Sequence, residues 1–462
     1  MNTKAKSAAK RQFGLYCETA FLPQGWCSGV RLEASSGRFT AVEIDATRRP
    51  GDQPVAIALP GVGNLHSHAF QRGLAGLAEQ RGPTGDNFWT WRAAMYRFVA
   101  RLDPEDVEAI AALAYAEMLE AGFTRVAEFQ YLHHDRDGKP FAAPAEMSGR
   151  IAAAAAQTGI GLTLLPVFYA QGGFGGLPAD DAQARFVTDP DSYACLIDAC
   201  RAVVRALPDA LVGIAPHSLR AATPEQLRLI LPLARDGPIH IHIAEQTREV
   251  AECLAWSGAR PVAWLLDHCP VDRRWCLVHA THLVPAEINA LAASGATAGL
   301  CPITEANLGD GLFPLDAFQR AGGCFGIGTD SNILISLTEE LRLLEYGQRL
   351  KFEARNVGAF ASGSATGRTL FEAALVGGAR ALGKATGLAV GCAADVVCLD
   401  ADHPSLLSRL RDSLLDSLIF AGSVGAIASV WRAGRQVVRD GRHVERPAIM
   451  AAYRASLGKL LA

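Results

Sequence analysis

The sequence of 462 residues predicts an α/β protein with a TIM-like (β/α)8 barrel and a small β-sandwich built from the N- and C-terminal segments. Between about Ala56 and Ser331, short apolar runs alternate with amphipathic helical stretches, which is typical of a parallel sheet with helical crossovers. The flanking segments look β-rich and do not continue this alternation. We therefore expect residues 1–59 and 387–462 to form the sandwich, the latter with a terminal helix, and residues 60–386 to form the barrel.

Eight apolar runs supply the barrel strands, because each is rich in Val, Ile, Leu or Phe, as buried parallel strands are. Eight strand–helix units close most naturally into a barrel, and a doubly wound open sheet is the alternative. The Gly-rich phosphate turn that such a sheet often carries is missing, which favours the barrel. The runs are Ala56–His66, Arg125–Gln130, Gly161–Tyr169, Leu211–Ala215, Pro238–Ile243, Trp275–Ala280, Ala296–Cys301 and Cys324–Thr329.

Helical periodicity fills the gaps between these runs. The stretch Pro104–Ala121 begins with proline and ends at Gly122, and Pro224–Arg235 begins with proline and stops before Gly237. Chain termini commonly lie near each other, so the extended terminal segments are expected to pair into one sandwich. These segments are Arg38–Ile44, Asp395–Leu399 and Ser429–Val438.

Composition favours small molecules as partners over nucleic acid or a membrane. The formal net charge is −3, and Lys and Arg are scattered instead of gathered into a basic stripe. The polar N-terminal stretch Met1–Arg11 leads into no apolar segment, and no run of eighteen uncharged apolar residues follows. We therefore expect a cytoplasmic protein.

Histidines and an aspartate stand where the predicted strands end, which is where active sites of such barrels lie. His66 and His68 are two apart on an extended backbone, so both imidazoles project to one side. Of His240 and His242 only one need be a ligand, and we choose His242 because it lies nearer the strand end. With Asp330, these residues predict a site for one divalent metal ion, expected to be Zn²⁺, with an open position for water.

Two further residues at strand ends, His279 and Glu245, are suited to proton transfer. Such a metal ion would lower the pKa of bound water towards about 7. Asp330 and His279 are candidates to accept a proton from this water, and Glu245, three residues past His242, is a candidate to donate one to a departing nitrogen. The alternative for Glu245 is an acid at the start of the next helix.

These strand ends resemble the amidohydrolase superfamily along nearly the whole chain. Its members with two metals carry a carboxylated Lys at the end of strand four, whereas residues 214–220 here read IAPHSLR. The resemblance therefore implies one metal and aminohydrolase chemistry. Within the superfamily the chain is similar to the formimidoylglutamate deiminases in residues 66–72 (HSHAFQR), 216–220 (PHSLR), 240–246 (HIHIAEQ) and 301–311 (CPITEANLGDG).

The resemblance implies a homodimer that hydrolyses N-formimino-L-glutamate to N-formyl-L-glutamate and ammonia in histidine degradation. This substrate has a cationic head and two carboxylates, so Arg92 and Arg220 are candidates for bidentate carboxylate binding. By similarity to the family, Gln71, Tyr131 and His217 are added as hydrogen-bond partners. The alternatives are surface charges for the arginines, a helix cap for the glutamine and core packing for the other two.

Two rival functions remain open at this point. A related aminohydrolase would act on a nucleobase or on another N-substituted amino acid, but ring deaminases need stacking surfaces and amide-type readers, whereas this pocket offers two arginines. A non-catalytic barrel should have lost at least one metal ligand, and this sequence has lost none.

The aromatic stretch Gly85–Trp91 is either part of a lid over the pocket or a surface for a partner subunit.

Overall fold

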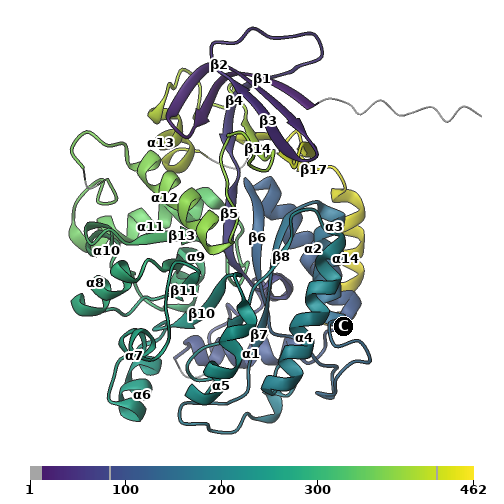
Figure 1. Ribbon diagram of the computed structural model, residues 1–462, viewed down its shortest axis with the longest axis vertical. Coiled ribbons are helices and arrows are strands. Elements are labelled where there is room, and N and C mark those ends of the chain that lie inside the picture. The colour runs from purple at the N-terminus through teal and green to yellow at the C-terminus, as the bar shows by residue number, and fades with distance from the viewer. Residues whose placement is uncertain (1–12, 83–84, 360, 423–424) are drawn as a thin grey trace, which may run out of the picture.

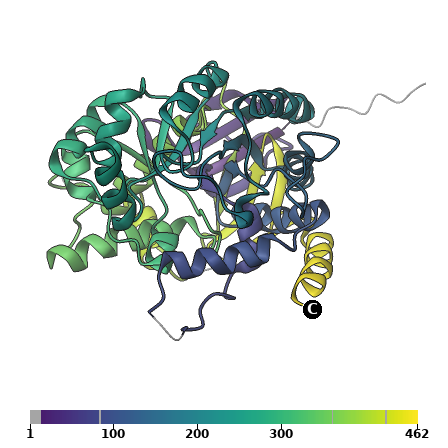
Figure 2. The same ribbon diagram turned by 90° about the horizontal axis from the view of Figure 1, so that it is seen from below.

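The computed structural model describes residues 13–82, 85–359, 361–422 and 425–462, so the first twelve residues of the predicted segment 1–59 lie outside the described residues. Figure 1 shows a mixed sheet at the top of the molecule and, below it, parallel strands enclosed by helices. Seen from below in Figure 2, the helices surround these strands. The parts predicted as α/β and as β-rich are therefore both present.

Two parallel sheets contain the strands predicted for the barrel. In one sheet β5, β6, β7 and β8 are neighbours in that order and β9 also pairs with β7, and in the other the order is β10, β11, β12, β13. Single parallel bridges join Ile214 to Ile239 and Ser67 to Asp330, so each sheet meets the other at both edges. The strands are β5 Val62–Ser67, β6 Phe123–Gln130, β7 Gly161–Phe168, β8 Leu211–Val212, β9 Ala215–Pro216, β10 Ile239–Ile243, β11 Trp275–His279, β12 Thr297–Leu300 and β13 Cys324–Ile327.

The first predicted strand, Ala56–His66, is wrong at its start. Ala56–Leu59 belongs to the terminal sheet as part of β4 (Gln53–Pro60), and β5 begins only at Val62. The chain passes from one sheet to the other at Gly61, where an added Cβ would overlap the side chain of Thr124. One continuous apolar run therefore serves two strands.

The helices begin and end largely as their capping residues predict. The predicted helix Pro104–Ala121 is α2, which has Pro104 in its first turn and gives way to Gly122 at φ 91°. The stretch Pro224–Arg235 holds α5 and a following 3-10 helix, Leu231–Ala234. The α-helices are α1 Phe88–Val99, α2 Pro104–Glu120, α3 Glu146–Thr158, α4 Pro190–Val203, α5 Pro224–Ile230, α6 Thr247–Ser257, α7 Pro261–His268, α8 Pro285–Ser294, α9 Pro302–Leu308, α10 Leu315–Arg320, α11 Leu337–Phe352, α12 Thr366–Ala381, α13 Asp412–Phe420 and α14 Arg446–Leu461.

The terminal segments share one eight-stranded sheet, in the order β17, β16, β15, β14, β4, β1, β2, β3. The predicted pairing of the two chain ends is confirmed, because β14 is antiparallel to β4. Since β4 leads directly into β5, this sheet lies at the amino end of β5, and the polar strand ends face away from it (Figure 1). Besides β4, the strands are β1 Phe13–Leu22, β2 Gly25–Ser35, β3 Arg38–Glu43, β14 Val396–Leu399, β15 Ile427–Arg432, β16 Arg435–Arg439 and β17 Arg442–His443.

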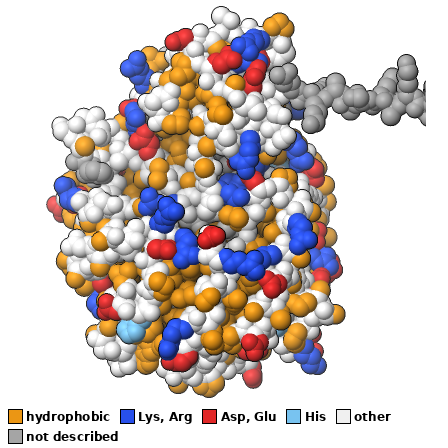
Figure 3. Space-filling view, viewed as in Figure 1, with side chains coloured by type: hydrophobic (Ala, Val, Ile, Leu, Met, Phe, Trp, Pro, Cys, Tyr) orange, Lys and Arg blue, Asp and Glu red, His pale blue; other side chains and the backbone are white. Residues whose placement is uncertain are grey.

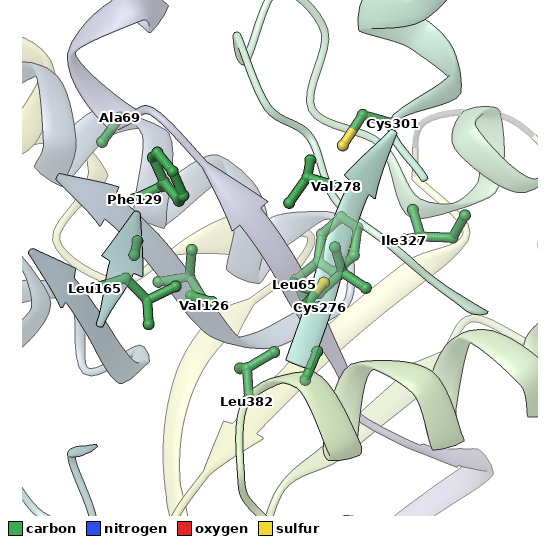
Figure 4. Close-up of a cluster of buried hydrophobic side chains, with 14 of the residues drawn as sticks. Leu65, Ala69, Val126, Phe129, Leu165, Cys276, Val278, Cys301, Ile327 and Leu382 are labelled. Atoms are coloured by element: carbon green, nitrogen blue, oxygen red, sulfur yellow. The ribbon is translucent and has the colours of Figure 1, made fainter. Parts of the chain in front are cut away.

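Apolar side chains from several of the parallel strands meet in one buried cluster (Figure 4). Leu65 of β5, Val126 and Phe129 of β6, Leu165 of β7 and Val278 of β11 are all fully buried. Burying each such side chain stabilises the fold by roughly 1.5–3 kcal/mol. Because close-packed interiors deform little, this cluster gives the strand ends a rigid base.

Charged side chains of both signs are mixed on the part of the surface seen in Figure 3. On the face seen in Figure 3, Lys and Arg side chains are interspersed with Asp and Glu. A mixed surface of this kind differs from the single-sign stripe that attracts nucleic acid. Within the described ranges, no helix combines the length and the apolar character that crossing a membrane requires.

Helix α12 packs so closely on the strands that Gly377 cannot carry a side chain. A Cβ there would overlap the carbonyl oxygen of Phe325 in β13. We expect Gly377→Ala to lower the free energy of unfolding by about 3 kcal/mol, measured by urea denaturation, because the helix backbone has to move. Gly149→Ala in α3 is the control, since its Cβ would meet nothing within 4 Å and should stabilise by up to about 1 kcal/mol. Equal stability of Gly377→Ala and wild type would contradict this close packing.

Candidate active site

The four predicted metal ligands lie together at the carboxyl ends of the strands. His66 Nε2 lies 3.1 Å from His68 Nε2 and 2.9 Å from His242 Nε2. Asp330 Oδ1 lies 3.4 Å from His66 Nε2 and 3.2 Å from His68 Nε2, and all four residues are buried. Four ligands of a tetrahedral zinc ion, at about 2.0–2.2 Å from it, are about 3.3 Å apart. The spacing therefore matches a single ion.

The hydrogen bonds of these imidazoles show that the donor set fits a divalent metal. His68 Nδ1 lies 3.0 Å from the carbonyl oxygen of Phe129, and His242 Nδ1 lies 3.2 Å from that of His217. A carbonyl only accepts, so each Nδ1 carries the proton and each Nε2 presents a lone pair. Burial lowers the pKa of His66 to about 3 and also lowers the pKa of His68, which keeps these ligands neutral. A cation between these nitrogens would stabilise the lone pairs that face one another.

The backbone carrying the site adopts left-handed φ angles at three residues that are not glycine. The φ angles are 50° at Ala244, 68° at His279 and 44° at Asp330. Such conformations cost roughly 1–3 kcal/mol each and cluster at functional sites. At Ala244 the left-handed conformation is stabilised by Glu249, whose carboxylate accepts hydrogen bonds of 3.2 Å from the backbone N–H groups of Ala244 and Glu245. These two hydrogen bonds fix the backbone position from which the side chain of Glu245 extends.

The three predicted catalytic residues are brought together beside the four ligands. His279 Nε2 lies 3.7 Å from Glu245 Oε1 and 3.8 Å from Asp330 Oδ2. Burial opposes a charge on His279, but Glu245, Glu305 and Asp330 raise its pKa to about 10. Burial raises the pKa of Glu245 to about 7, against the opposing charges of His279 and Arg220. A carboxyl and an imidazole, both with raised pKa values, therefore lie close together, an arrangement that is common at acid–base sites.

Glu305 is a member of this site that the sequence analysis missed. Its Oε1 lies 3.2 Å from His279 Nδ1 and accepts a 2.9 Å hydrogen bond from the backbone N–H of Cys301. A carboxylate on Nδ1 fixes the orientation of the ring and favours its protonated form. The only signal in the sequence was the position of Glu305 inside the distinctive stretch 301–311.

A pocket opens at the predicted metal ligands, and two arginines, Arg92 and Arg220, are part of its wall. Gln71 Nε2 donates a 2.8 Å hydrogen bond to Tyr131 Oη, and Arg92 Nε donates to Tyr96 Oη. Arg220 is buried, and its Nε has no hydrogen-bond partner among the described residues. An unpartnered buried donor is costly and is suited to a ligand. The five residues predicted to bind substrate, Gln71, Arg92, Tyr131, His217 and Arg220, all line this pocket together with His68, His242, Glu245, His279 and Asp330.

The ring of Trp89, which is not part of the pocket wall, lies near three guanidinium groups. Their central carbons lie 5.4 Å (Arg92), 5.8 Å (Arg220) and 4.3 Å (Arg248) from the centroid of its ring, within the range of cation–π attraction. Arg248 lies in α6 and is not among the residues that line the pocket. Trp89 and Trp91 lie on α1, and Trp91 lines the pocket. A lid formed by residues 85–91 stays a prediction.

Comparisons with known proteins agree with this site. The amidohydrolase family model matches residues 57–437. The chain is 52% identical over 450 residues to a protein named formimidoylglutamate deiminase from Pseudomonas aeruginosa, covering 97% of this chain and 99% of that protein.

Solved structures extend the comparison to the whole fold. A crystal structure of an amidohydrolase from Brucella melitensis has a TM-score of 0.95 and 50% identity, covering 98% of this chain and 100% of that one. An adenosine deaminase from Xanthomonas campestris, solved with bound zinc, has a TM-score of 0.78 and 25% identity, covering 97% and 98% of the two chains. This family uses a divalent metal, and the four clustered ligands meet that need. From its matched residues and from the geometry of its site, the chain belongs to the amidohydrolase family.

Proposed function

We propose that this chain is a formimidoylglutamate deiminase, which hydrolyses N-formimino-L-glutamate to N-formyl-L-glutamate and ammonia. The observation that carries the proposal is the set of charged groups in the pocket wall. The wall combines the predicted metal ligands, Glu245 and His279 with two arginines, Arg92 and Arg220. The substrate calls for both kinds of group, because it has a cationic formimino group and two carboxylates. The 52% identity to the Pseudomonas aeruginosa protein of that name supports the assignment.

The reaction needs two proton transfers, one from the attacking water and one to the departing nitrogen, and different residues carry them out. A divalent ion held by the four ligands, zinc in our proposal, would supply Lewis acidity and would lower the pKa of a water molecule. The positive charge of a metal ion in the site would favour the unprotonated forms of His279 and Asp330, and in that state they accept a proton from the attacking water. Glu245 donates a proton to the departing nitrogen, which leaves as ammonia with the electron pair of the carbon–nitrogen bond. The hydroxyl proton left from the attacking water passes to the ionised Glu245, so that the formyl group remains. Zinc is supported by the donor set and by the zinc bound in the Xanthomonas campestris structure.

The substrate carboxylates are bound by guanidinium groups in this proposal. Arg92 and Arg220 each offer a planar set of donors that matches a carboxylate. Gln71, Tyr131 and His217 line the same wall and supply hydrogen bonds to the glutamate portion. We also propose that the enzyme is a cytoplasmic homodimer, as the family resemblance and the composition suggest.

The architecture predicted from the sequence is part of the same proposal. We propose that the two parallel sheets form one closed (β/α)8 barrel over residues 60–386, with residues 1–59 and 387–462 as its β-sandwich. The parallel bridges at Ser67 and Ile214 support closure, because they connect the edges of both sheets. The pairing of β4 with β14 supports a single terminal domain.

One assay tests the proposed function against its rival. Ammonia release is measured with N-formimino-L-glutamate, with formimino derivatives of other amino acids, and with guanine, cytosine and adenosine. We expect N-formimino-L-glutamate to give the highest kcat/KM. The structural likeness to an adenosine deaminase makes a nucleobase the second candidate, and faster turnover of any ring substrate would overturn our assignment.

Removing the Arg220 guanidinium should weaken substrate binding more than catalysis. We expect Arg220→Met to raise KM for N-formimino-L-glutamate by about 10–100-fold with little change in kcat, since a hydrogen bond to a charged group contributes about 1.5–3 kcal/mol. Steady-state kinetics give both constants. Arg228→Met on α5, where Arg228 is exposed and paired with Glu225, is the matched control. An unchanged KM in Arg220→Met would remove the support for a dicarboxylate substrate.

A further inference from the structure

The two arginines of the pocket wall, Arg92 and Arg220, have no carboxylate partner of their own. Neither guanidinium forms an ion pair within the part of the chain that the structure describes. Arg92 Nε donates a hydrogen bond to the neutral phenol of Tyr96, and Arg220 Nε is buried without a partner among the described residues. Two cations that face the same pocket repel each other. A group other than a carboxylate therefore has to hold them in place.

The ring of Trp89 approaches both guanidinium groups. The central carbon of Arg92 lies 5.4 Å and that of Arg220 lies 5.8 Å from the centroid of the ring. Cations within about 6 Å of an aromatic face are attracted to it, most strongly when the ring is that of tryptophan. Arg92 also lies over the ring of Tyr96, but among the described residues Trp89 is the only ring over which both guanidinium groups lie.

The fold fixes the position of this ring from two helices. The backbone N–H of Trp89 donates a 2.9 Å hydrogen bond to Asn87 Oδ1, the cap of α1. Arg92 is three residues further along α1 and so lies on the same side of the helix. Arg248 of α6, which pairs with Glu252, lies 4.3 Å from the centroid of the ring. Figure 1 shows α1 and α6 at the end of the molecule opposite the terminal sheet, so the ring lies at the end where the polar strand ends meet.

An aromatic ring suits a site that has to bind carboxylates. A carboxylate beside a guanidinium accepts two of its N–H groups and neutralises its charge. A ring attracts the same charge through its quadrupole and leaves those N–H groups available for a ligand. The unpartnered Nε of Arg220 agrees with this arrangement.

We propose that Trp89 is a positioning residue, which holds Arg92 and Arg220 by cation–π attraction so that their N–H groups are free to bind the substrate carboxylates. This inference rests on the proposed function. Trp89 is not part of the pocket wall, so it acts through the two arginines and not on the reacting atoms. Its loss should therefore change substrate affinity more than turnover.

The test compares Trp89→Leu and Trp89→Phe in the metal-loaded full chain, with N-formimino-L-glutamate and N-formimino-L-glutamine as substrates. We expect Trp89→Leu to raise KM for the glutamate compound by about 3–30-fold with little change in kcat, which is the range of a cation–π contact. The glutamine compound has one carboxylate fewer, so its KM should rise by a smaller factor. Trp89→Phe keeps a weaker aromatic face and should give an intermediate KM.

Two further proteins separate this role from a general effect of losing a tryptophan. Trp256→Leu in α6 is the matched control and should keep the wild-type KM, because Trp256 stacks on Phe174 and does not line the pocket. In an Arg220→Met background, Trp89→Leu should raise KM by a smaller factor, since one of the two arginines that it positions is gone.

The inference is wrong if Trp89→Leu has the KM of wild type, or if the leucine and phenylalanine variants have equal KM values. Should Trp89→Leu fail to fold, a wild-type KM in Trp89→Phe would overturn the inference. Failure of wild-type protein to release ammonia from N-formimino-L-glutamate would instead overturn the proposed function.

Discussion

The Glu245→Gln variant is expected to release ammonia from N-formimino-L-glutamate about 10²–10⁴ times more slowly than wild type, which is the range that a general acid contributes. Glutamine has nearly the same shape but has no acidic proton to give to the departing nitrogen. The side chain is buried and lies 3.7 Å from His279, so no solvent molecule takes its place easily. A coupled ammonia assay at saturating substrate measures the loss in kcat.

The metal site and substrate affinity serve as internal controls for this variant. Glu245 is not among the four clustered ligands, so metal content per chain and KM should stay close to those of wild type. Glu225→Gln, at an exposed acid of α5, should have wild-type activity. A Glu245→Gln protein that keeps more than a tenth of the wild-type kcat would show that another group donates the proton.

Loss of His242 should remove both the metal and the activity. Its Nε2 is one of the three nitrogens that face the common centre, 2.9 Å from that of His66. Changes to residues that only support a ligand already cost 10–100-fold, so we expect His242→Ala to lose more than about 100-fold in activity. Elemental analysis after dialysis should find well under one divalent ion per chain.

The chain contains a matched control two residues away on the same strand. His240 is also buried, but its Nε2 lies 2.8 Å from the carbonyl oxygen of Ala381, away from the ligand cluster. We expect His240→Ala to retain its metal and to lose about 2 kcal/mol of stability, because it leaves a cavity and an unsatisfied carbonyl. Equal metal loss in both variants would mean that the choice between these histidines was wrong.

The catalytic end of the site could be predicted because it depends on short-range rules. Residues two apart on a strand face the same way, which brings His66 and His68 together. Strands of a barrel end on one face, which adds His242, His279 and Asp330. These two rules need only strand positions, and an apolar run of a few residues gives those.

The same rules could not predict contacts between segments that are distant in the sequence. Glu305 meets His279 across two strand ends, and Arg248 meets the ring of Trp89 between α6 and α1. Neither contact has a period or spacing in the sequence. The start of the first barrel strand, β5, was predicted wrongly for a related reason. Ala56–Leu59 is as apolar as β5, so the composition of the sequence does not show that one strand ends and the next begins at Gly61.

The pairing of β4 with β14 has a consequence for how the protein is made. The residues of β4 leave the ribosome early, whereas β14, at Val396–Leu399, emerges when most of the chain has been synthesised. Until then one edge of β4 is open, and open strand edges invite association with other chains. Native closure of this domain must therefore await about the last seventh of translation.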